Sequence, residues 1–121
     1  MAERRRLSKA ERQAVYDKMG GHCAYCGREI TLQQMQADHV IPIELYDAYA
    51  LLDGLNPDPN NLDNLLPACR SCNNYKHTLM LDRFRAALER MPGVLERDNV
   101  TYRNAVRFGL VTPTPPRPWR P

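Results

Sequence analysis

The first segment with a clear hydrophobic pattern lies near the start of the chain and has helical periodicity. Val15 and Met19 fall on one face at a spacing of four residues. Ser8 and Glu11, three residues apart, have the spacing of a helix capping box, and two consecutive glycines follow Met19. The pattern predicts a helix over Lys9–Met19.

The middle of the chain contains two short apolar runs separated by a long polar connection. The run MQADHVIPI (35–43) is typical of a strand that ends near Pro42, because proline is tolerated at strand ends but not inside a ladder. LLPA (65–68) predicts a second short strand. Between them, ELYDAYALLDG (44–54) predicts a short helix, and the Asn, Asp and Pro content of NPDPNNLDN (56–64) indicates a loop.

Helical patterns return after the second strand. A helix is predicted over 69–79, beginning at the second cysteine pair. LDRFRAALERM (81–91) places Phe84 and other apolar residues on one side of another helix, which Pro92 and the glycine after it are expected to close. ERDNVTYRNAVRFG (96–109) predicts a last helix, although its Asn, Val and Thr are weak helix formers.

The length and composition fit one small domain with a thin core. The chain has 121 residues, with only two phenylalanines and one tryptophan, so we expect an additional staple. Residues 1–110 are assigned to the domain, and the proline-rich residues 111–121 to a flexible tail. No apolar run approaches membrane-spanning length and the first residues lack an apolar signal region, which predicts a soluble, intracellular protein.

Four cysteines form two CxxC pairs that are 42 residues apart, Cys23 with Cys26 and Cys69 with Cys72. In a reducing compartment this spacing favours metal binding over disulfides. Four thiolates are the ligand set of a closed tetrahedral zinc site, which leaves no position for water and stabilises the fold. The alternatives are four unrelated cysteines and a redox pair, and the redox interpretation lacks a surrounding parallel βαβ pattern.

The net charge of +3 is unevenly distributed along the chain. Residues 1–20 carry six basic and three acidic side chains. Residues 21–64 carry one basic and seven acidic side chains, and residues 65–121 carry ten basic and four acidic side chains. An acidic centre between basic flanks suits a metal site beside a polyanion, whereas ordinary solvated faces are the alternative explanation.

Three sequence blocks in the same region carry a resemblance to a known family. CAYC (23–26), ADHVIP (37–42) and NLLPACRSCNNYK (64–76), in this order, resemble the HNH endonucleases of phages and bacteria. The resemblance covers Cys23–His77, about half of the chain. It implies a ββα-metal core, a β-hairpin plus a helix around one divalent cation, stapled by zinc on the two CxxC pairs. With further helices at both ends, the expected fold class is α+β.

The resemblance also implies roles for individual residues. His39 matches the general base, Asp38 the cation ligand before it, and Asn64 the asparagine that braces a loop and orients the histidine. Neighbours on a strand point to opposite faces, so one residue can hold metal while the other addresses water. Asn73 stands where many members have histidine, and its amide oxygen favours Mg²⁺ or Mn²⁺. His77, four residues later, is a third ligand, a donor to the phosphate, or a surface histidine.

Basic residues on the flanks suggest that the polyanion is DNA. Lysines and arginines neutralise phosphates in a salt-dependent, largely sequence-independent way, and no sequence-recognition module is evident. We also expect a protein partner for the proline-rich tail, a monomer or weak dimer, and no membrane association. The expected location is the cytoplasm of a bacterial or phage-infected cell. The candidate DNA contacts are Arg70, Lys76, Arg83, Arg85, Arg90 and Arg97.

Three functions remain open on the sequence. The first is a metal-dependent endonuclease that nicks duplex DNA with little sequence specificity. The second is a non-catalytic, zinc-stapled nucleic-acid-binding domain, for which the basic flanks suffice. The third is a phage packaging accessory that acts mainly through protein contacts.

Overall fold

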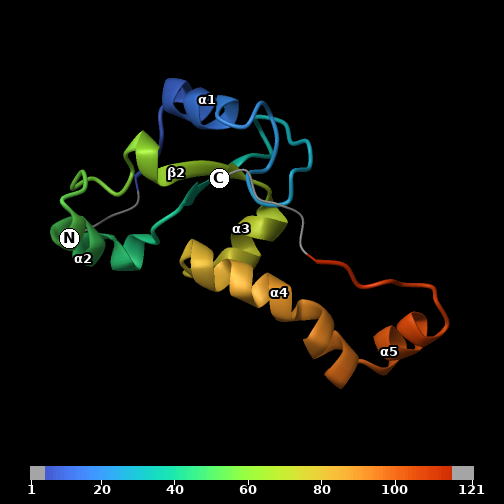
Figure 1. Cartoon of the computed structure of the whole chain (residues 1–121). Helices are drawn as coiled ribbons and strands as arrows, with labels where there is room; N and C mark the ends of the chain where they lie inside the picture. Colours follow the sequence, from blue (N-terminus) through green and yellow to red (C-terminus); the bar gives the residue numbers. More distant parts are fainter. Residues whose placement is uncertain (1–4, 116–121) are drawn as a thin grey trace. The chain divides into compact units, whose positions relative to one another are not determined.

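The computed structural model describes residues 5–115, so that part of the predicted tail, residues 116–121, lies outside the described residues (Figure 1). The chain divides into two compact units, with the boundary between Leu81 and Asp82, inside the span predicted as one domain. The α+β fold class is confirmed. The elements in chain order are α1 (Lys9–Asp17), β1 (Gln36–His39), α2 (Ile43–Asp53), the 3₁₀ helix η1 (Leu62–Asn64), β2 (Leu65–Ala68), α3 (Arg70–Lys76), α4 (Leu81–Asp98) and α5 (Val100–Arg107).

Helix α1 confirms the predicted first helix and its cap. The Ser8 side chain accepts from the Glu11 backbone N–H, and the Glu11 side chain accepts from the Ser8 N–H. The helix buries Val15. Lys18, just after it, donates to the carbonyl of Leu65 at 2.8 Å, which ties the end of the helix to the start of β2.

The two predicted strands form one antiparallel hairpin, β1 with β2. Gln36 pairs with Ala68 at one end, and His39 pairs with Leu65 at the other. Helix α2 and η1 lie in the connection between the strands, as the sequence predicts for the helix. Because α3 follows β2 directly, the hairpin and this helix form the expected ββα arrangement around the end of β1 (Figure 1).

Helix α3 ends earlier than the sequence predicts. Its last residue is Lys76, and His77 has a φ of 51° and a ψ of −120°. The Leu79 N–H then donates to the Lys76 carbonyl at 2.9 Å, which closes a tight turn. The prediction that the helix continues to residue 79 is therefore wrong, because the positive φ of His77 turns the chain out of the helix.

Helix α4 passes through its predicted stop signal. Pro92 lies inside the helix. Gly93 does not have a positive φ, so it does not make the left-handed cap of a helix end. The helix loses one backbone donor at Pro92 and continues to Asp98. Asn99 then caps the separate helix α5 through the N–H of Tyr102.

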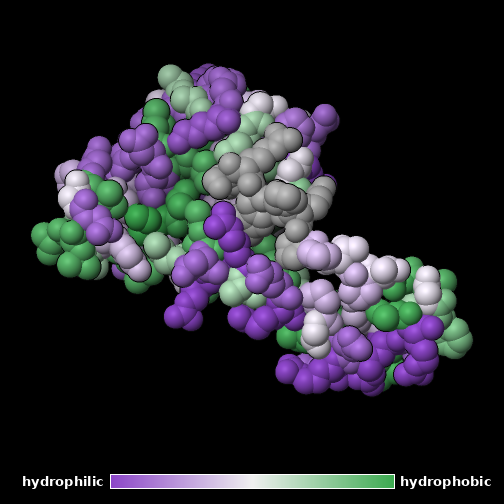
Figure 2. Space-filling view, viewed as in Figure 1, coloured by the Kyte–Doolittle hydropathy of each residue, from purple (hydrophilic) through white to green (hydrophobic). Residues whose placement is uncertain are grey.

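The core of the first unit is small and leaves apolar side chains exposed on α2. Met35, Tyr46 and Leu65 are fully buried, whereas Leu51 and Leu52 are 85% and 80% exposed. Figure 2 shows the hydrophobic atoms that gather over α2, at the left of the view. Among the described residues, no helix is both long and apolar enough to span a membrane.

Candidate active site and cysteine cluster

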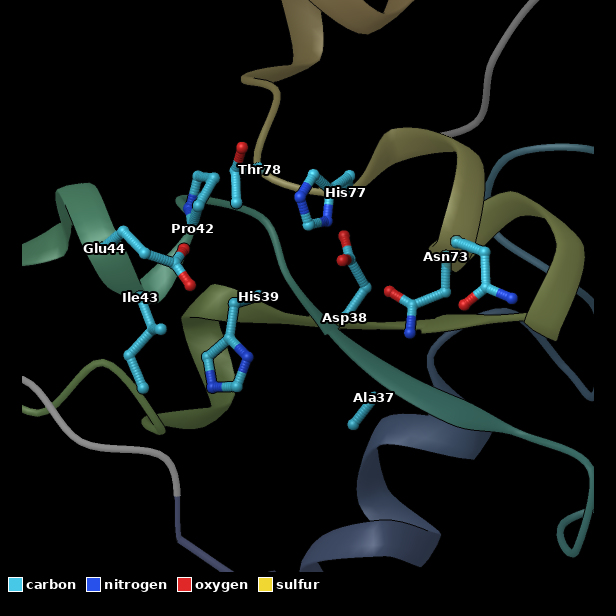
Figure 3. Close-up of a pocket in the computed structure, with 10 residues that line it drawn as sticks. Ala37, Asp38, His39, Pro42, Ile43, Glu44, Asn73, His77 and Thr78 are labelled. Carbon is cyan, nitrogen blue, oxygen red and sulfur yellow. The ribbon is translucent and has the colours of Figure 1, made fainter.

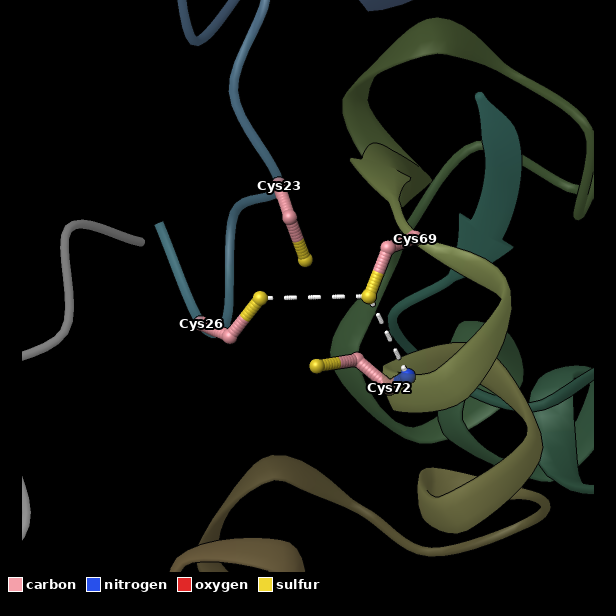
Figure 4. A group of neighbouring side chains, drawn as sticks. All are labelled: Cys23, Cys26, Cys69 and Cys72. Carbon is pink, nitrogen blue, oxygen red and sulfur yellow. Dashed lines mark hydrogen bonds between the residues drawn. The ribbon is translucent and has the colours of Figure 1, made fainter. Parts of the chain in front are cut away.

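The four cysteines form one cluster, two from the segment before β1 and two from the start of α3 (Figure 4). Their Sγ atoms lie within 4.8 Å of one another, and those of Cys26 and Cys69 are 3.8 Å apart. Four sulfurs around zinc at about 2.3 Å form a tetrahedron with edges of about 3.8 Å. The cluster is therefore compatible with a structural zinc ion.

The backbone of each CxxC turn aims its sulfur atoms. Cys69 caps α3, and its Sγ accepts from the Cys72 N–H at 3.4 Å. The Tyr25 N–H donates to Cys23 Sγ at the same distance of 3.4 Å. Gly27 has the positive φ, 79°, that a tight turn after the first pair requires. Local sequence thus sets each half of the cluster, and the hairpin brings the halves together.

Without a bound cation, the cluster favours a single thiolate, at Cys23. The hydrogen bond from Cys72 lowers the pKa of Cys23 to about 4. Hydrogen bonding to Cys23 raises the pKa of Cys72, and burial raises the pKa of Cys26. A divalent cation offsets the repulsion between several charged sulfurs. Binding of Zn²⁺ is therefore what allows all four cysteines to be thiolates at once.

A polar pocket of about 450 Å³, here called the Asp38 pocket, lies beside the end of β1 (Figure 3). Figure 3 shows the Asp38 carboxylate extending toward His77, while the His39 ring extends from β1 in the opposite direction, as strand alternation requires. The pocket brings together the predicted base and the three predicted cation ligands. Its polar lining includes Asp38, His39, Glu44, Asn73 and His77.

Asp38 is buried, and its Oδ2 atom binds two neighbours. The Tyr25 hydroxyl donates to it at 2.5 Å, and the Lys76 Nζ lies 3.1 Å away. Burial and the nearby Asp38 charge raise the pKa of Tyr25, so the phenol stays protonated and donates. Both contacts involve Oδ2, so Oδ1 is the oxygen that Asp38 can offer to a cation in the pocket.

Lys76 does not lie where the sequence predicts. Its side chain is 0% exposed, and besides Asp38 its Nζ donates to the carbonyls of His39 at 3.0 Å and Val40 at 3.3 Å. An ammonium group buried against β1 cannot reach a DNA phosphate, so the predicted phosphate contact is wrong. Lys76 instead neutralises Asp38 and fastens α3 to the end of β1.

Replacing Lys76 with Met is expected to lower the free energy of unfolding by about 3–5 kcal/mol, because it leaves the Asp38 carboxylate buried without its cationic partner. Urea denaturation of the wild type and the variant measures the difference. Lys9→Met, a change of the same kind at an exposed position on α1, is the control and should cost no more than about 0.5 kcal/mol. A Lys76→Met loss as small as the control's would contradict the structural role.

His39 is held by Asn60, a residue without a motif signal. The Nε2 atom of His39 lies 2.8 Å from Oδ1 of Asn60, which is 3% exposed. The side-chain amide of Asn60 donates to Asp58 Oδ1 at 3.3 Å. The loop between α2 and η1 therefore reaches the candidate base directly.

Asn64 has the loop-bracing contacts that the resemblance implies. It is buried, its Oδ1 accepts from the Ile41 N–H at 2.9 Å, and its Nδ2 donates to the carbonyls of Ile41 at 3.2 Å and Pro59 at 2.9 Å. These bonds fasten the segment after β1 to the loop. The side-chain partner of His39 is Asn60, so the orienting role of Asn64 stays a prediction.

Asn73 lies in α3 and is oriented by a residue of β1. Its Nδ2 donates to Gln36 Oε1 at 2.6 Å. Because the amide nitrogen is held there, the amide oxygen of Asn73 is the atom that remains to act as a ligand. Gln36 is thus a second supporting residue that sequence spacing alone did not reveal.

His77 reaches the Asp38 pocket from the turn after α3. It is exposed, and among the described residues it is the one non-glycine residue with positive φ. A non-glycine residue in such a conformation costs about 1–3 kcal/mol, and strained residues of this kind cluster at functional sites. The side chain contributes an imidazole to the pocket although its backbone conformation suits glycine.

A second hollow of about 470 Å³, here called the arginine hollow, also includes His39 in its lining. Arg12 is fixed there, because it donates to the carbonyls of Leu32 at 2.6 Å and Met35 at 2.9 Å. Arg5 forms a bidentate pair with Glu11 at 2.9 and 3.0 Å. The basic and polar lining residues are Arg5, Arg6, Arg12, Gln33, His39 and Asn60.

The other predicted DNA contacts lie at the surface. Because α4 is continuous through Pro92, arginines spaced seven residues apart lie on one helix. Arg97 pairs with the neighbouring Asp98 at 2.9 Å, with both side chains exposed. Contact with DNA stays a prediction for this set, and its exposed members are Arg70, Arg83, Arg85, Arg90 and Arg97.

Comparison with known proteins identifies the middle of the chain. Residues 23–79 match the family model described as HNH endonuclease. Among curated proteins, none matches the chain. The matched span contains both cysteine pairs, the β-hairpin and α3, and it extends two residues beyond the span of the sequence resemblance.

Proposed function

Because residues 23–79 form an HNH endonuclease family domain, we propose that this chain is a metal-dependent endonuclease that hydrolyses DNA phosphodiester bonds. We propose further that it nicks duplex DNA with little sequence specificity. The observation that carries the proposal is the pocket in which a carboxylate, an amide and two imidazoles meet, from Asp38, Asn73, His39 and His77.

The ligand set of the Asp38 pocket fits a hard divalent cation. Asp38 has Oδ1 to offer, and the Gln36 contact leaves the Asn73 oxygen as its ligand atom. Carboxylate and amide oxygens suit Mg²⁺ or Mn²⁺, and His77 is the third proposed ligand. When bound, the cation supplies charge stabilisation to the phosphate oxygens.

His39 is the proposed general base. It lines the same pocket but projects from β1 on the side opposite Asp38, so the imidazole stays separate from the proposed ligands (Figure 3). It takes a proton from the attacking water, whose oxygen forms the new bond to phosphorus while the bond to the leaving sugar oxygen breaks. Neutral imidazole is suited to this transfer near neutral pH.

The arginine hollow is the proposed path of the DNA backbone. It shares His39 with the Asp38 pocket and adds three guanidinium groups, from Arg5, Arg6 and Arg12. Arginines bind phosphates without reading bases, which supports low sequence specificity. The exposed arginines of α3 and α4 are proposed as further phosphate contacts.

Conversion of supercoiled plasmid to open circles tests the proposal. Wild-type protein should nick with Mg²⁺ or Mn²⁺ and should be inactive with EDTA in excess of all metal. Binding of plasmid without nicking, under every cation, would contradict the endonuclease and favour the non-catalytic DNA-binding alternative.

Arg6→Ala is expected to weaken DNA binding in a salt-dependent way. Removal of one phosphate contact should lower the slope of log Kd against log salt by about 1, measured by fluorescence anisotropy in EDTA so that the DNA stays intact. Lys9→Ala removes the same charge from the exposed surface of α1, outside the hollow, and is the control. Equal slopes for the two variants would contradict the proposed path.

A further inference from the structure

The contact between His39 and Asn60 has a defined direction. The two side chains meet at 2.8 Å between Nε2 and Oδ1, and Asn60 is almost fully buried, so little water competes for the bond. An amide viewed by itself can present either its oxygen or its nitrogen to an imidazole. Which atom faces His39 is decided by the other partners of the amide.

Asp58 decides the orientation of the Asn60 amide. Its Oδ1 accepts from the Asn60 backbone N–H at 2.9 Å and from Asn60 Nδ2 at 3.3 Å. If the amide were flipped, its oxygen would face the carboxylate oxygen of Asp58, and two acceptors would meet without a proton between them. The amide oxygen of Asn60 therefore points to His39.

An acceptor at Nε2 fixes the tautomer of the neutral imidazole. Neutral histidine has one N–H and one bare nitrogen, and the nitrogen that faces an acceptor carries the proton. The proton of His39 is then on Nε2, and Nδ1 has the lone pair that accepts a proton. Holding a histidine in one tautomer and one orientation is how a partner residue supports an imidazole base.

The loop that carries Asn60 is held from several sides. The Asn64 side chain donates to the Pro59 carbonyl at 2.9 Å, and Asn61 Nδ2 donates to the Tyr46 hydroxyl at 2.9 Å. Tyr46 is fully buried in α2. Asn60 is thus presented to His39 by a fixed scaffold and not by a free loop.

We propose that Asn60, aimed by Asp58, is a positioning residue that holds His39 with its proton on Nε2 and with Nδ1 as the base atom. The catalytic meaning of this contact rests on the proposed endonuclease function. The tautomer itself does not, because it is a property of the folded protein without DNA or catalytic cation. The long connection between the strands then serves to orient the base, and does not merely link β1 to β2.

Nuclear magnetic resonance of protein labelled with ¹⁵N in the histidine rings tests the tautomer. At a pH where the imidazole is neutral, the wild type should show a slowly exchanging ring proton of His39 on Nε2 and a bare Nδ1. Asn60→Ala should lose the slow exchange, whereas Asn61→Ala, which loosens the same loop without touching His39, should keep it. A ring proton on Nδ1 in the wild type would overturn the proposal, whether or not the protein cuts DNA.

A swapped pair tests the part assigned to Asp58. Asp58→Asn combined with Asn60→Asp exchanges donor and acceptor between the two side chains and still presents an oxygen to His39. The Nε2 proton should therefore be retained. Its loss in a variant that keeps the wild-type melting temperature would overturn the role of Asp58 in aiming the amide.

Nicking kinetics test the catalytic consequence. Asn60→Ala should lower kcat by at least about tenfold to a hundredfold, the range found for outer residues that orient histidines at metal sites, with KM unchanged. Asn61→Ala should lower the melting temperature and leave kcat within about threefold. An unchanged kcat in Asn60→Ala would overturn the positioning role even if the tautomer is as proposed.

Discussion

His39→Ala is expected to lower the rate of plasmid nicking by about a hundredfold to ten-thousandfold, the range that a positioned general base contributes. The physical reason is that the attacking water loses the imidazole that takes its proton, while the Asp38 pocket keeps its carboxylate and amide. Fold and DNA affinity should change little, because the ring is only partly buried and lies at the pocket surface. The first-order rate of open-circle formation measures the effect.

His22→Ala is the matched control for this experiment. His22 has the same side chain and lies in the same unit, but its ring contacts the carbonyls of Met19 and Gly20, away from the pocket. Its removal should leave nicking within about twofold of the wild type. If His39→Ala nicked as fast as His22→Ala, His39 would not be the base.

Cys72→Ser is expected to unfold the first unit. A structural zinc ion contributes about 10–16 kcal/mol of apparent binding free energy, comparable with or greater than the whole stability of a small domain. The loss of one thiolate from a cluster whose sulfurs lie within 4.8 Å leaves the two CxxC turns without a shared ion. Amide hydrogen exchange of β1 and β2 should become as fast as in an unfolded chain, and the variant should contain less than one zinc per protein.

Ser71→Ala is the control beside Cys72, since Ser71 is an exposed residue of the same helix. It should keep one zinc and the protection of both strands. Chelation of the wild-type protein should reproduce the Cys72→Ser result without any mutation. Protected strands in metal-free protein would be incompatible with zinc as the staple of the fold.

The sequence predicted the elements wherever local chemistry decides them. The capping box at Ser8 set the start of α1, and the run at 65–68 is β2 residue for residue. The two CxxC pairs indicated their cluster, because spacing and turn chemistry are local properties. Local signals failed at the ends of α3 and α4, where the stop depends on the φ that His77 and Gly93 adopt in the folded chain.

The candidate site divides in the same way. Motif positions identified Asp38, His39 and Asn73, whereas the sequence left the role of His77 open, and the structure places all four in one pocket. The residues that support them carry no spacing signal. Asn60, Gln36 and Tyr25 each form a hydrogen bond with a site residue that is distant in the sequence, and only folding brings the partners together.

By itself, then, the sequence determined the residue types at the candidate site, the paired cysteine turns and the order of strands and helix, because these depend on residues close together in the chain. Tertiary structure alone decided that Lys76 is buried on Asp38 instead of exposed to DNA, and that Asn60 instead of Asn61 or Asn64 bonds His39. The physical reason is that burial and hydrogen-bond partners between distant residues are set by packing, which neither composition nor periodicity encodes.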